Sequence, residues 1–218
     1  MLRDDVHEWT AVAGSLGVAP ERLLLIKQVH GTHVAVARRG DPAPWTRPQA
    51  DIIVTGDPDV AIGVRVADCA PVLLHDPVNH AVGAAHAGWR GTAAGASVAA
   101  VRAMQATFGS RARDLVAAIG PCLGACCGEV GPDVVEAFRA GGADPASLAA
   151  WLRPGAGDRA FLDLERANRD QLRQSGVRPE AIFTSGLCTK THRARLHSYR
   201  GEGHTAGRIV AAIRAQIA

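Results

Sequence analysis

The stretch VADCAPVLLHDPVNHAVGAAHAGWRG, residues Val66 to Gly91, decides the fold because it contains two apolar runs around a turn. The runs Pro71–His75 and His80–Ala85 flank the sequence DPVN at 76–79, and Asp, Pro and Asn all favour a tight reversal of the chain. The pattern predicts a β-hairpin in the first half of the chain.

The hairpin register brings a cysteine and a histidine together. If the loop is residues 76–79, counting outward sets Cys69 opposite His86. Directly opposed residues have Cβ atoms about 4.5–5.5 Å apart, close enough for a thiolate and an imidazole to bind one metal ion. Pro71 cannot donate to the ladder and is typical of an edge or a bulge, where a register can slip.

Composition indicates one domain, residues 1–218. The chain is 47% hydrophobic, and no linker or composition break divides it. Its +3 formal charge is spread out and aromatic residues make up only 4%, so neither nucleic-acid nor membrane-surface binding is indicated. The amino terminus resembles no signal region and no apolar stretch has transmembrane length, which predicts a cytoplasmic protein. Five cysteines, an odd number, favour metal binding, catalysis or burial over a disulfide framework.

Short apolar runs predict further strands, and longer periodic runs predict helices. The strands are Leu23–Val29, Val34–Ala37, Asp51–Thr55, Val60–Val66, Leu115–Ile119, Ala181–Thr184 and Ala194–Tyr199. The helices are Val6–Leu16, Thr92–Phe108, Asp133–Phe138, Leu162–Gln174 and Arg208–Ile217. Strands occur both as hairpins and separated by helices, so the predicted class is α+β, with mixed β-sheets and flanking helices. The Gly-, Ala- and Pro-rich segment Gly141–Asp158 is predicted to be an exposed excursion.

A metal site needs a third ligand, and the segment KQVHGTH offers His30 and His33 at the end of a predicted strand. Either histidine completes a two-histidine, one-cysteine set. Three protein ligands leave one tetrahedral position open, which is typical of a catalytic zinc. The alternative is that Cys69 is a small buried hydrophobic residue and the histidines are ordinary hydrogen-bonded residues. Spacing alone does not decide between these interpretations.

The residues after His86 have the pattern of an anion site. A strand, the turn AGWRG and a helix that begins near Thr92 present backbone N–H groups and the positive end of a helix dipole. Arg90 is then the side chain that clamps a phosphate, because a guanidinium binds phosphate oxygens in bidentate fashion.

A second cysteine cluster lies in IGPCLGACCGEVG at 119–131, with Cys122, Cys126, Cys127 and the nearby Glu129. Its spacing differs from paired C-x-x-C, and adjacent cysteines rarely bind one ion together, so a structural zinc is not expected. The segment is either a substrate-lining loop or a tight turn with small buried residues. Further polar candidates, equally typical of strands and surfaces, follow near the carboxyl end: Cys188, Thr189, His197, Ser198, Tyr199, Arg200 and Arg208.

Six motifs in fixed order carry a resemblance to a known family. They are KQVHG, VADCAPVLL, AAHAGWRGT, AIGPCLGACCGEVG, the Cys188-Thr189 pair and SYRGEGHTAGR. From about Lys27 to Arg208 the chain resembles the YfiH-like family, also called laccase-domain or multicopper polyphenol oxidoreductase proteins.

The resemblance implies a YfiH-like fold, related to a toxin deamidase that uses a Cys–His pair, and a purine nucleoside phosphorylase. The implied substrates are adenosine, inosine, guanosine and methylthioadenosine, together with phosphate, and adenosine deamination is an implied companion activity. It also implies zinc bound by His30, Cys69 and His86, which favours His30 over His33. Residues expected to take part in catalysis or to contact substrate, beside these ligands, are Lys27, Gln28, Asp68, Arg90, Cys126, Glu129 and Arg200.

On this basis deamination uses water activated at the zinc site, whereas phosphorolysis requires phosphate held against an oxocarbenium-like ribose. Arg90, the adjacent helix start and Lys27 are expected to hold the phosphate. Asp68 or Glu129 is the candidate to protonate or orient the purine.

Three alternatives use the same residues. A copper-dependent, laccase-like polyphenol oxidase is disfavoured because the nine histidines include no H-x-H pair and the only methionines are Met1 and Met104, although copper in the same site is compatible with weak phenol oxidation. A cysteine or metal hydrolase and a non-catalytic, metal-stabilised protein are the other two.

The sequence departs from the family pattern at three places. Family members usually carry a Gly-Gly-Val-Ser-type segment before the region that LRDDVHEW resembles, and this segment is expected to be missing here. Gly128 stands where an aromatic residue is common, and His197 stands where the family has Phe or Tyr. Both changes alter the expected shape of the base pocket.

Overall fold

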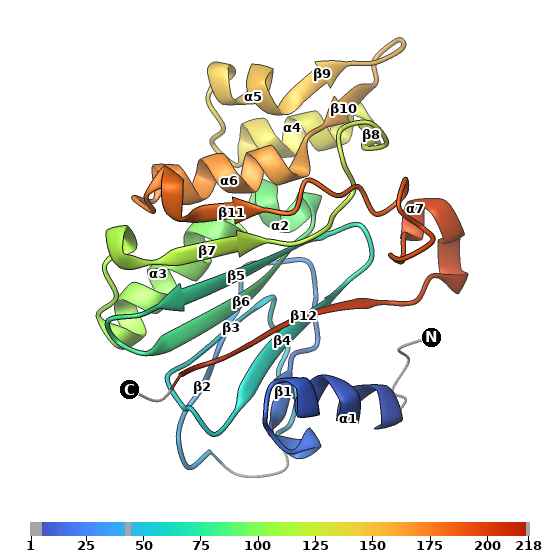
Figure 1. Cartoon of the computed structure of the whole chain (residues 1–218). Coiled ribbons are helices and arrows are strands. Elements are labelled where there is room, and N and C mark those ends of the chain that lie inside the picture. The colour runs from blue at the N-terminus through green and yellow to red at the C-terminus, as the bar shows by residue number, and fades with distance from the viewer. Residues whose placement is uncertain (1–5, 42–44, 217–218) are drawn as a thin grey trace.

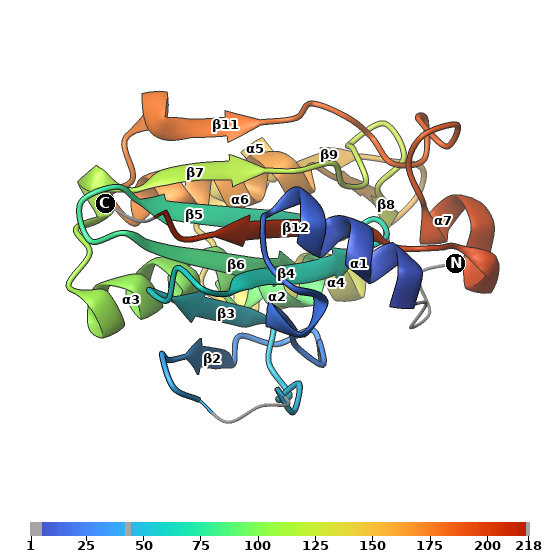
Figure 2. The same ribbon diagram turned by 60° about the horizontal axis from the view of Figure 1, so that its bottom comes forward.

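The computed structural model describes residues 6–41 and 45–216, and these residues form three β-sheets and seven α-helices. A six-stranded sheet lies in the middle, with helices on one face and a three-stranded sheet on the other (Figures 1 and 2). The predicted α+β class with mixed sheets and flanking helices is confirmed.

The six-stranded sheet has the order β11-β7-β5-β6-β3-β2. Its four central strands are antiparallel, and the strand at each edge is parallel to its neighbour. The strands are β2 (Val34–Ala37), β3 (Ile52–Thr55), β5 (Ala70–Asp76), β6 (Ala81–Ala87), β7 (Val116–Ile119) and β11 (Ile182–Thr184). β3 is buried on both faces: Ile52 and Val54 pack on the helix side, and Ile53 packs on the other sheet. A strand that is buried on both faces has a nearly continuous apolar sequence, as the sequence IIVT of β3 does.

The second sheet consists of β1 (Leu23–Leu25), β4 (Ala61–Val66) and β12 (Ile209–Arg214), in the order β1-β4-β12. Successive side chains on a strand point to opposite faces. Leu24 therefore packs between the two sheets, whereas Leu23 and Leu25 pack under α1 (Val6–Ser15) with Trp9. This sheet thus forms its own layer between the large sheet and α1.

The other face of the large sheet is covered by α2 (Trp89–Ala93), α3 (Ala96–Phe108) and α6 (Leu164–Gln174). A third, small sheet of β8 (Glu129–Val130), β10 (Ala160–Leu162) and β9 (Leu152–Pro154) lies near α4 and α5. The remaining helices are α4 (Pro132–Ala140), α5 (Pro145–Trp151), α7 (Tyr199–Glu202) and the short 3-10 helices Pro20–Arg22, Ala112–Asp114, Pro179–Ala181 and Gly203–Thr205. None of the described helices has the length and apolar composition needed to cross a membrane.

The hairpin of β5 and β6 exists, but its predicted register is wrong by two residues. Pro71 faces His86, and the loop is residues 77–80, not 76–79. The loop shifts because the Asp76 carboxylate accepts hydrogen bonds from the backbone N–H of Val78 (2.8 Å) and of Asn79 (3.1 Å), which ends the strand at Asp76. A shift of two residues keeps every side chain on its predicted face, so the expected approach of Cys69 and His86 survives it.

Two predicted elements near the carboxyl end are wrong. Ala194–Tyr199 is a series of turns that leads into α7, where the Ser198 hydroxyl accepts a hydrogen bond from the N–H of Gly201. The predicted helix Arg208–Ile217 is instead the strand β12, up to Arg214, and its last predicted residue lies outside the described part of the chain. A short apolar run fits a helix or a strand, and here pairing with the free edge of β4 decides for the strand.

Three other predicted segments differ from the structure by more than the one or two residues seen at the ends of the remaining elements. The strand expected at Leu23–Val29 ends at Leu25 because the Asp51 carboxylate collects the N–H groups of residues 29–31 and turns the chain. The helix expected at Thr92–Phe108 begins earlier, at Trp89, and is broken in two at Gly95, whose φ is 82°. The excursion Gly141–Asp158 contains α5 and β9 and is anchored by the buried ring of Trp151.

Candidate active site and metal-binding group

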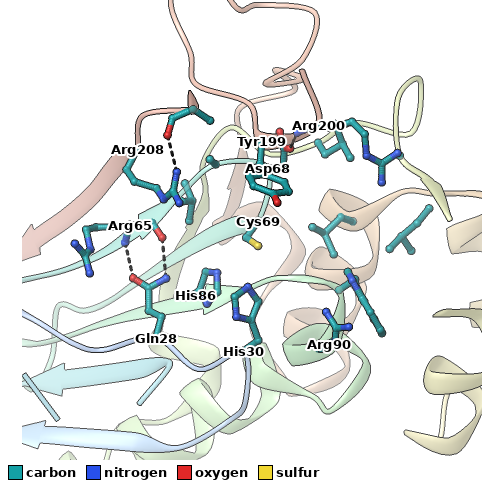
Figure 3. Close-up of a pocket in the computed structure, with 18 of the residues that line it drawn as sticks. Gln28, His30, Arg65, Asp68, Cys69, His86, Arg90, Tyr199, Arg200 and Arg208 are labelled. Atoms are coloured by element: carbon teal, nitrogen blue, oxygen red, sulfur yellow. Dashed lines mark hydrogen bonds between the residues drawn. The ribbon is translucent and has the colours of Figure 1, made fainter. Parts of the chain in front are cut away.

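A cavity of about 800 Å³ opens at the ends of β4, β5 and β6 (Figure 3). Its walls come from residues of four segments, 27–30, 65–69, 86–90 and 199–208, together with part of 123–130 and of 162–164. Small-molecule sites have volumes of roughly 300–1,000 Å³, so the cavity has the size for a nucleoside.

His30, Cys69 and His86 converge on one wall of this cavity. Their ligand atoms all lie within 4.8 Å of one another, and we call them the His–Cys–His group. His30 lies in the loop between β1 and β2 with a positive φ of 63°, Cys69 lies between β4 and β5, and His86 lies on β6. One thiolate and two imidazoles are the ligand types of zinc, and three protein ligands leave a fourth position for substrate or water. The chemistry of this donor set therefore fits a catalytic zinc.

Asp51, which the sequence analysis missed, holds two of these residues in place. Its fully buried carboxylate accepts hydrogen bonds from the N–H of His30 (2.9 Å) and Gly31 (2.6 Å) and from Nδ1 of His86 (2.8 Å). Donation from Nδ1 leaves Nε2 as the ring nitrogen of His86 that is available to a metal. The available signal was a lone carboxylate directly before a fully apolar run, in ADIIVT.

The electrostatics of the site favour the charged forms of Cys69, His86 and Asp51. Burial by itself raises the pKa of the Cys69 thiol, but hydrogen bonds from His30 and His86 and the charge of the imidazoles lower it to about 7. Burial by itself lowers the pKa of His86, but Asp51 and Cys69 raise it to about 9. Burial opposes the ionisation of Asp51 as well, yet His86 and the backbone N–H groups hold its pKa below the ordinary value. A thiolate is accordingly available as a ligand near neutral pH.

Gly88 leaves the space that the Cys69 sulfur occupies. In the observed register it follows β6 directly, and a Cβ at this position would lie 2.7 Å from Cys69 Sγ and 3.4 Å from Cδ2 of His30. A glycine is therefore required by close packing against the His–Cys–His group. Through Gly88, the AGWRG turn packs directly against Cys69 and His30.

Most of the charged residues that line the cavity are basic. Asp68 is the only acidic residue among its described lining residues, and five basic ones line it: Lys27, Arg65, Arg90, Arg200 and Arg208. The guanidinium of Arg90 lies 4.1 Å from the centre of the Trp89 ring, which is a cation–π distance. The predicted anion-binding residues Lys27 and Arg90 thus line the same cavity as the His–Cys–His group. Their positive charges, with those of the other basic lining residues, favour the binding of an anion there.

Two predicted substrate-binding residues, Gln28 and Asp68, have their polar atoms engaged by the protein. The Gln28 amide bonds both the N–H (2.9 Å) and the carbonyl (2.7 Å) of Arg65, as the dashed lines in Figure 3 show. The Asp68 carboxylate accepts hydrogen bonds from the hydroxyl of Thr189 (2.6 Å) and the N–H of Arg200 (2.5 Å). Gln28 and Asp68 therefore position the cavity wall.

Two other predicted residues, Cys126 and Glu129, do not line the cavity. Cys126 lies instead in a second group with Cys127 and Cys188, and the Glu129 carboxylate lies 3.7 Å from Arg159. Arg200 connects this region to the cavity, because its Nη1 donates to the carbonyls of Cys127 and Glu129 while the residue lines the cavity. His33 is exposed and lies outside the His–Cys–His group.

Several lining residues had no assigned role in the sequence analysis. Arg65 is the one basic residue of β4 and is among the residues that line the cavity, while Tyr199 and Arg208 reach it from the carboxyl-terminal segment. A charged residue in an otherwise apolar strand was the signal for Arg65. Tyr199 and Arg208 were candidates in the motif SYRGEGHTAGR, but no local pattern indicated that they would reach this cavity, because the fold brings them there.

Comparison with known protein families shows to which family the chain belongs. Residues 4–216 match the family described as multi-copper polyphenol oxidoreductase laccase. The chain belongs to this family. The resemblance inferred from the six motifs is therefore confirmed.

Relatives in this family have names that bear on the reaction. The purine nucleoside phosphorylase of Deinococcus radiodurans is 38% identical over 205 residues, which is 93% of this chain and 74% of the relative. The purine nucleoside phosphorylase SCO2081 of Streptomyces coelicolor is 40% identical over 90% of this chain and 76% of its own length. The crystal structure of the hypothetical protein YfiH from Bacillus licheniformis superposes with a TM-score of 0.90 at 28% identity, covering 97% of this chain and 80% of that one.

Proposed function

We propose that this protein is a zinc-dependent purine nucleoside phosphorylase that acts in the cytoplasm. The observation that carries the proposal is the His–Cys–His group in the wall of a nucleoside-sized cavity lined by five basic residues. The phosphorylase names of the family's relatives support the same reaction.

His30, Cys69 and His86 are the residues that would hold the zinc. A zinc ion bound there supplies Lewis acidity that polarises a substrate oxygen or a water molecule. Asp51 fixes the ring of His86 and the loop of His30, so the three ligand atoms are preorganised.

Phosphorolysis also requires that phosphate be held against the ribose while the glycosidic bond breaks. Arg90 is the residue proposed to clamp the phosphate. It follows Gly88 and Trp89 in the chain, its guanidinium lies over the Trp89 ring, and it lines the same cavity as the His–Cys–His group. Lys27 and Arg65 add positive charge on the same cavity. Preorganised cations stabilise the negative charge of the attacking phosphate and of the leaving purine.

The proposed substrates are adenosine, inosine, guanosine and methylthioadenosine, with adenosine deamination as a companion activity in the same cavity. Tyr199, whose ring lines the cavity beside Arg200, provides an aromatic surface for a purine or ribose. Gly128 also lines the cavity, and an added Cβ there would lie 2.6 Å from the Leu162 carbonyl oxygen, so this backbone arrangement requires glycine where the family commonly has an aromatic side chain.

A second candidate, a cysteine hydrolase, is favoured by one observation. Cys69, His86 and Asp51 are connected in the order of a nucleophile, a base and an orienting carboxylate. Such an enzyme would use water, would not need phosphate and would keep its activity after metal removal.

The test is chromatography of inosine incubated with zinc-loaded protein, with and without phosphate. We expect phosphate-dependent release of hypoxanthine that is lost after chelation of the metal and in Cys69→Ala. The matched control is Cys122→Ser, because Cys122 is buried outside the His–Cys–His group and should keep the activity. Activity that survives chelation and needs no phosphate supports the hydrolase, and no hypoxanthine under any condition contradicts the assignment for inosine.

A further inference from the structure

A second group of sulfur ligands lies outside the nucleoside cavity. Cys126, Cys127 and Cys188 place their three sulfur atoms within 4.8 Å of one another, and we call them the cysteine trio. Cys126 and Cys127 come from the loop after β7, whereas Cys188 comes from the segment after β11, so the trio forms only in the folded chain. The function proposed above does not use these thiols.

The backbone around the trio is shaped to bring the sulfurs together. Cys122 and Cys188 are paired through a parallel bridge, in which the Cys122 carbonyl accepts the N–H of Thr189 (2.9 Å). Gly124 lies against the sulfurs: a Cβ there would be 3.0 Å from the Cβ of Cys188 and 3.5 Å from the sulfurs of both Cys126 and Cys188. The glycine thus leaves open the space into which two of the three thiols face.

The trio is partly open to solvent. Cys126 is exposed, Cys127 is partly exposed and Cys188 is buried. One anchored sulfur and two sulfurs that reach solvent allow an ion to enter from the surface.

We propose that the cysteine trio is a binding site for monovalent copper, Cu(I). Thiolates select soft ions, among which Cu(I) and Zn²⁺ are the common biological ones. Adjacent cysteines rarely bind one ion together, but here the sulfurs of Cys126 and Cys127 lie only 3.6 Å apart. Metal–sulfur bonds of about 2.3 Å in a plane place three sulfurs about 4 Å apart, which is within the observed separation. Binding forms three copper–sulfur bonds and releases the thiol protons to solvent, with no change in oxidation state.

Ligand number decides between copper and zinc. Structural zinc is almost always four-coordinate. Among the described residues, no fourth His, Cys, Asp or Glu joins the trio. Cu(I) is satisfied by three thiolates in a plane, so the trio fits copper better than structural zinc.

The site would connect two segments that shape the nucleoside cavity. The N–H of Leu123, a lining residue, donates to the Asp68 carbonyl, and the hydroxyl of Thr189 donates to the Asp68 carboxylate. Leu123 lies on the segment that supplies Cys126 and Cys127, and Thr189 directly follows Cys188. An ion held by the trio would therefore fasten both segments beside Asp68.

The test is an anaerobic Cu(I) titration in competition with bathocuproine disulfonate, with the ultraviolet thiolate-to-copper absorption as a second readout. Cys69→Ala is used as the background, because it removes the thiol of the His–Cys–His group. We expect this variant to bind one Cu(I) per chain. Adding Cys126→Ser or Cys188→Ser should weaken binding by about tenfold or more, since loss of even an outer-shell partner costs that much.

The matched control is Cys122→Ser in the same background, which removes a thiol of the same loop outside the trio and should leave Cu(I) affinity unchanged. Cys126 is exposed, so Cys126→Ser should not impair folding, and the melting temperature of the variant checks that it does not. An unchanged Cu(I) affinity in Cys69→Ala/Cys126→Ser overturns the site. Stoichiometric zinc binding by Cys69→Ala without Cu(I) binding overturns the choice of copper.

Discussion

At the residue scale, the His–Cys–His group depends on a missing side chain as much as on the side chains present. Gly88 has an extended φ of −69°, so backbone conformation alone does not require glycine. The requirement is steric, because a Cβ would lie 2.7 Å from Cys69 Sγ, closer than real Cβ contacts come. The sulfur or the backbone must then move, and ligand geometry tolerates little displacement.

We therefore predict that Gly88→Ala weakens zinc binding by about tenfold or more while the chain still folds, in line with the effect of perturbing a ligand's support. Competition with a chromophoric chelator measures the affinity, and circular dichroism checks the fold. The matched control is Gly14→Ala, where an added Cβ meets nothing within 4 Å. Wild-type zinc affinity in Gly88→Ala would show that the sulfur has room after all.

At the element scale, Asp76 sets the hairpin loop and hence the register. Burial raises its pKa, but the nearby Ser110 hydroxyl and hydrogen bonds from Asn79 and Val78 outweigh this and hold it below 3.8. A carboxyl whose pKa is lower in the folded state stabilises the fold at every pH above its unfolded pKa. That contribution is lost as the pH falls through the folded pKa.

Asp76→Asn should lower the free energy of unfolding by about 1–3 kcal/mol at pH 7, because it removes a buried, charged acceptor of the backbone hydrogen bonds that form the turn. The difference from wild type should shrink as the pH falls below about 4. Denaturant unfolding at several pH values measures both effects. Asp59→Asn is the control: its exposed pair with Arg39 contributes about 0–1 kcal/mol. A difference that stays constant down to acid pH would contradict the role of the charge.

The elements differ in how far the sequence determined them. The strand Val34–Ala37 was predicted with its observed bounds because a short apolar run is a local signal. The hairpin register was not, because the side chain of Asp76 placed the loop, and β12 was not, because pairing with β4 is non-local. The approach of Cys69 and His86 was predicted only because the register error was an even number of residues.

At the scale of the whole molecule, the His–Cys–His group lies where the two larger sheets join. His30 lies on the connection from β1 of the three-stranded sheet to β2 of the six-stranded one, and Cys69 lies on the connection from β4 to β5. His86 belongs to the six-stranded sheet itself. His30 therefore meets the Cys69–His86 pair only after the sheets have packed, which no local pattern in the sequence expresses. Asp51 was missed for the same reason, because its partners are brought to it by the fold.

A metal that binds this group stabilises the folded chain, because the unfolded chain offers no preformed site. Zinc at 100 times its dissociation constant should add about 2.7 kcal/mol to the free energy of unfolding. For a chain of this size that corresponds to a rise in melting temperature of roughly 5–10 °C. Calorimetry of zinc-loaded and chelator-treated protein measures the shift, which Cys122→Ser and Cys126→Ser should retain and Cys69→Ala should lose. An equal shift in Cys69→Ala would mean that zinc stabilises the chain at some other place, and the three segments would then be held together by packing alone.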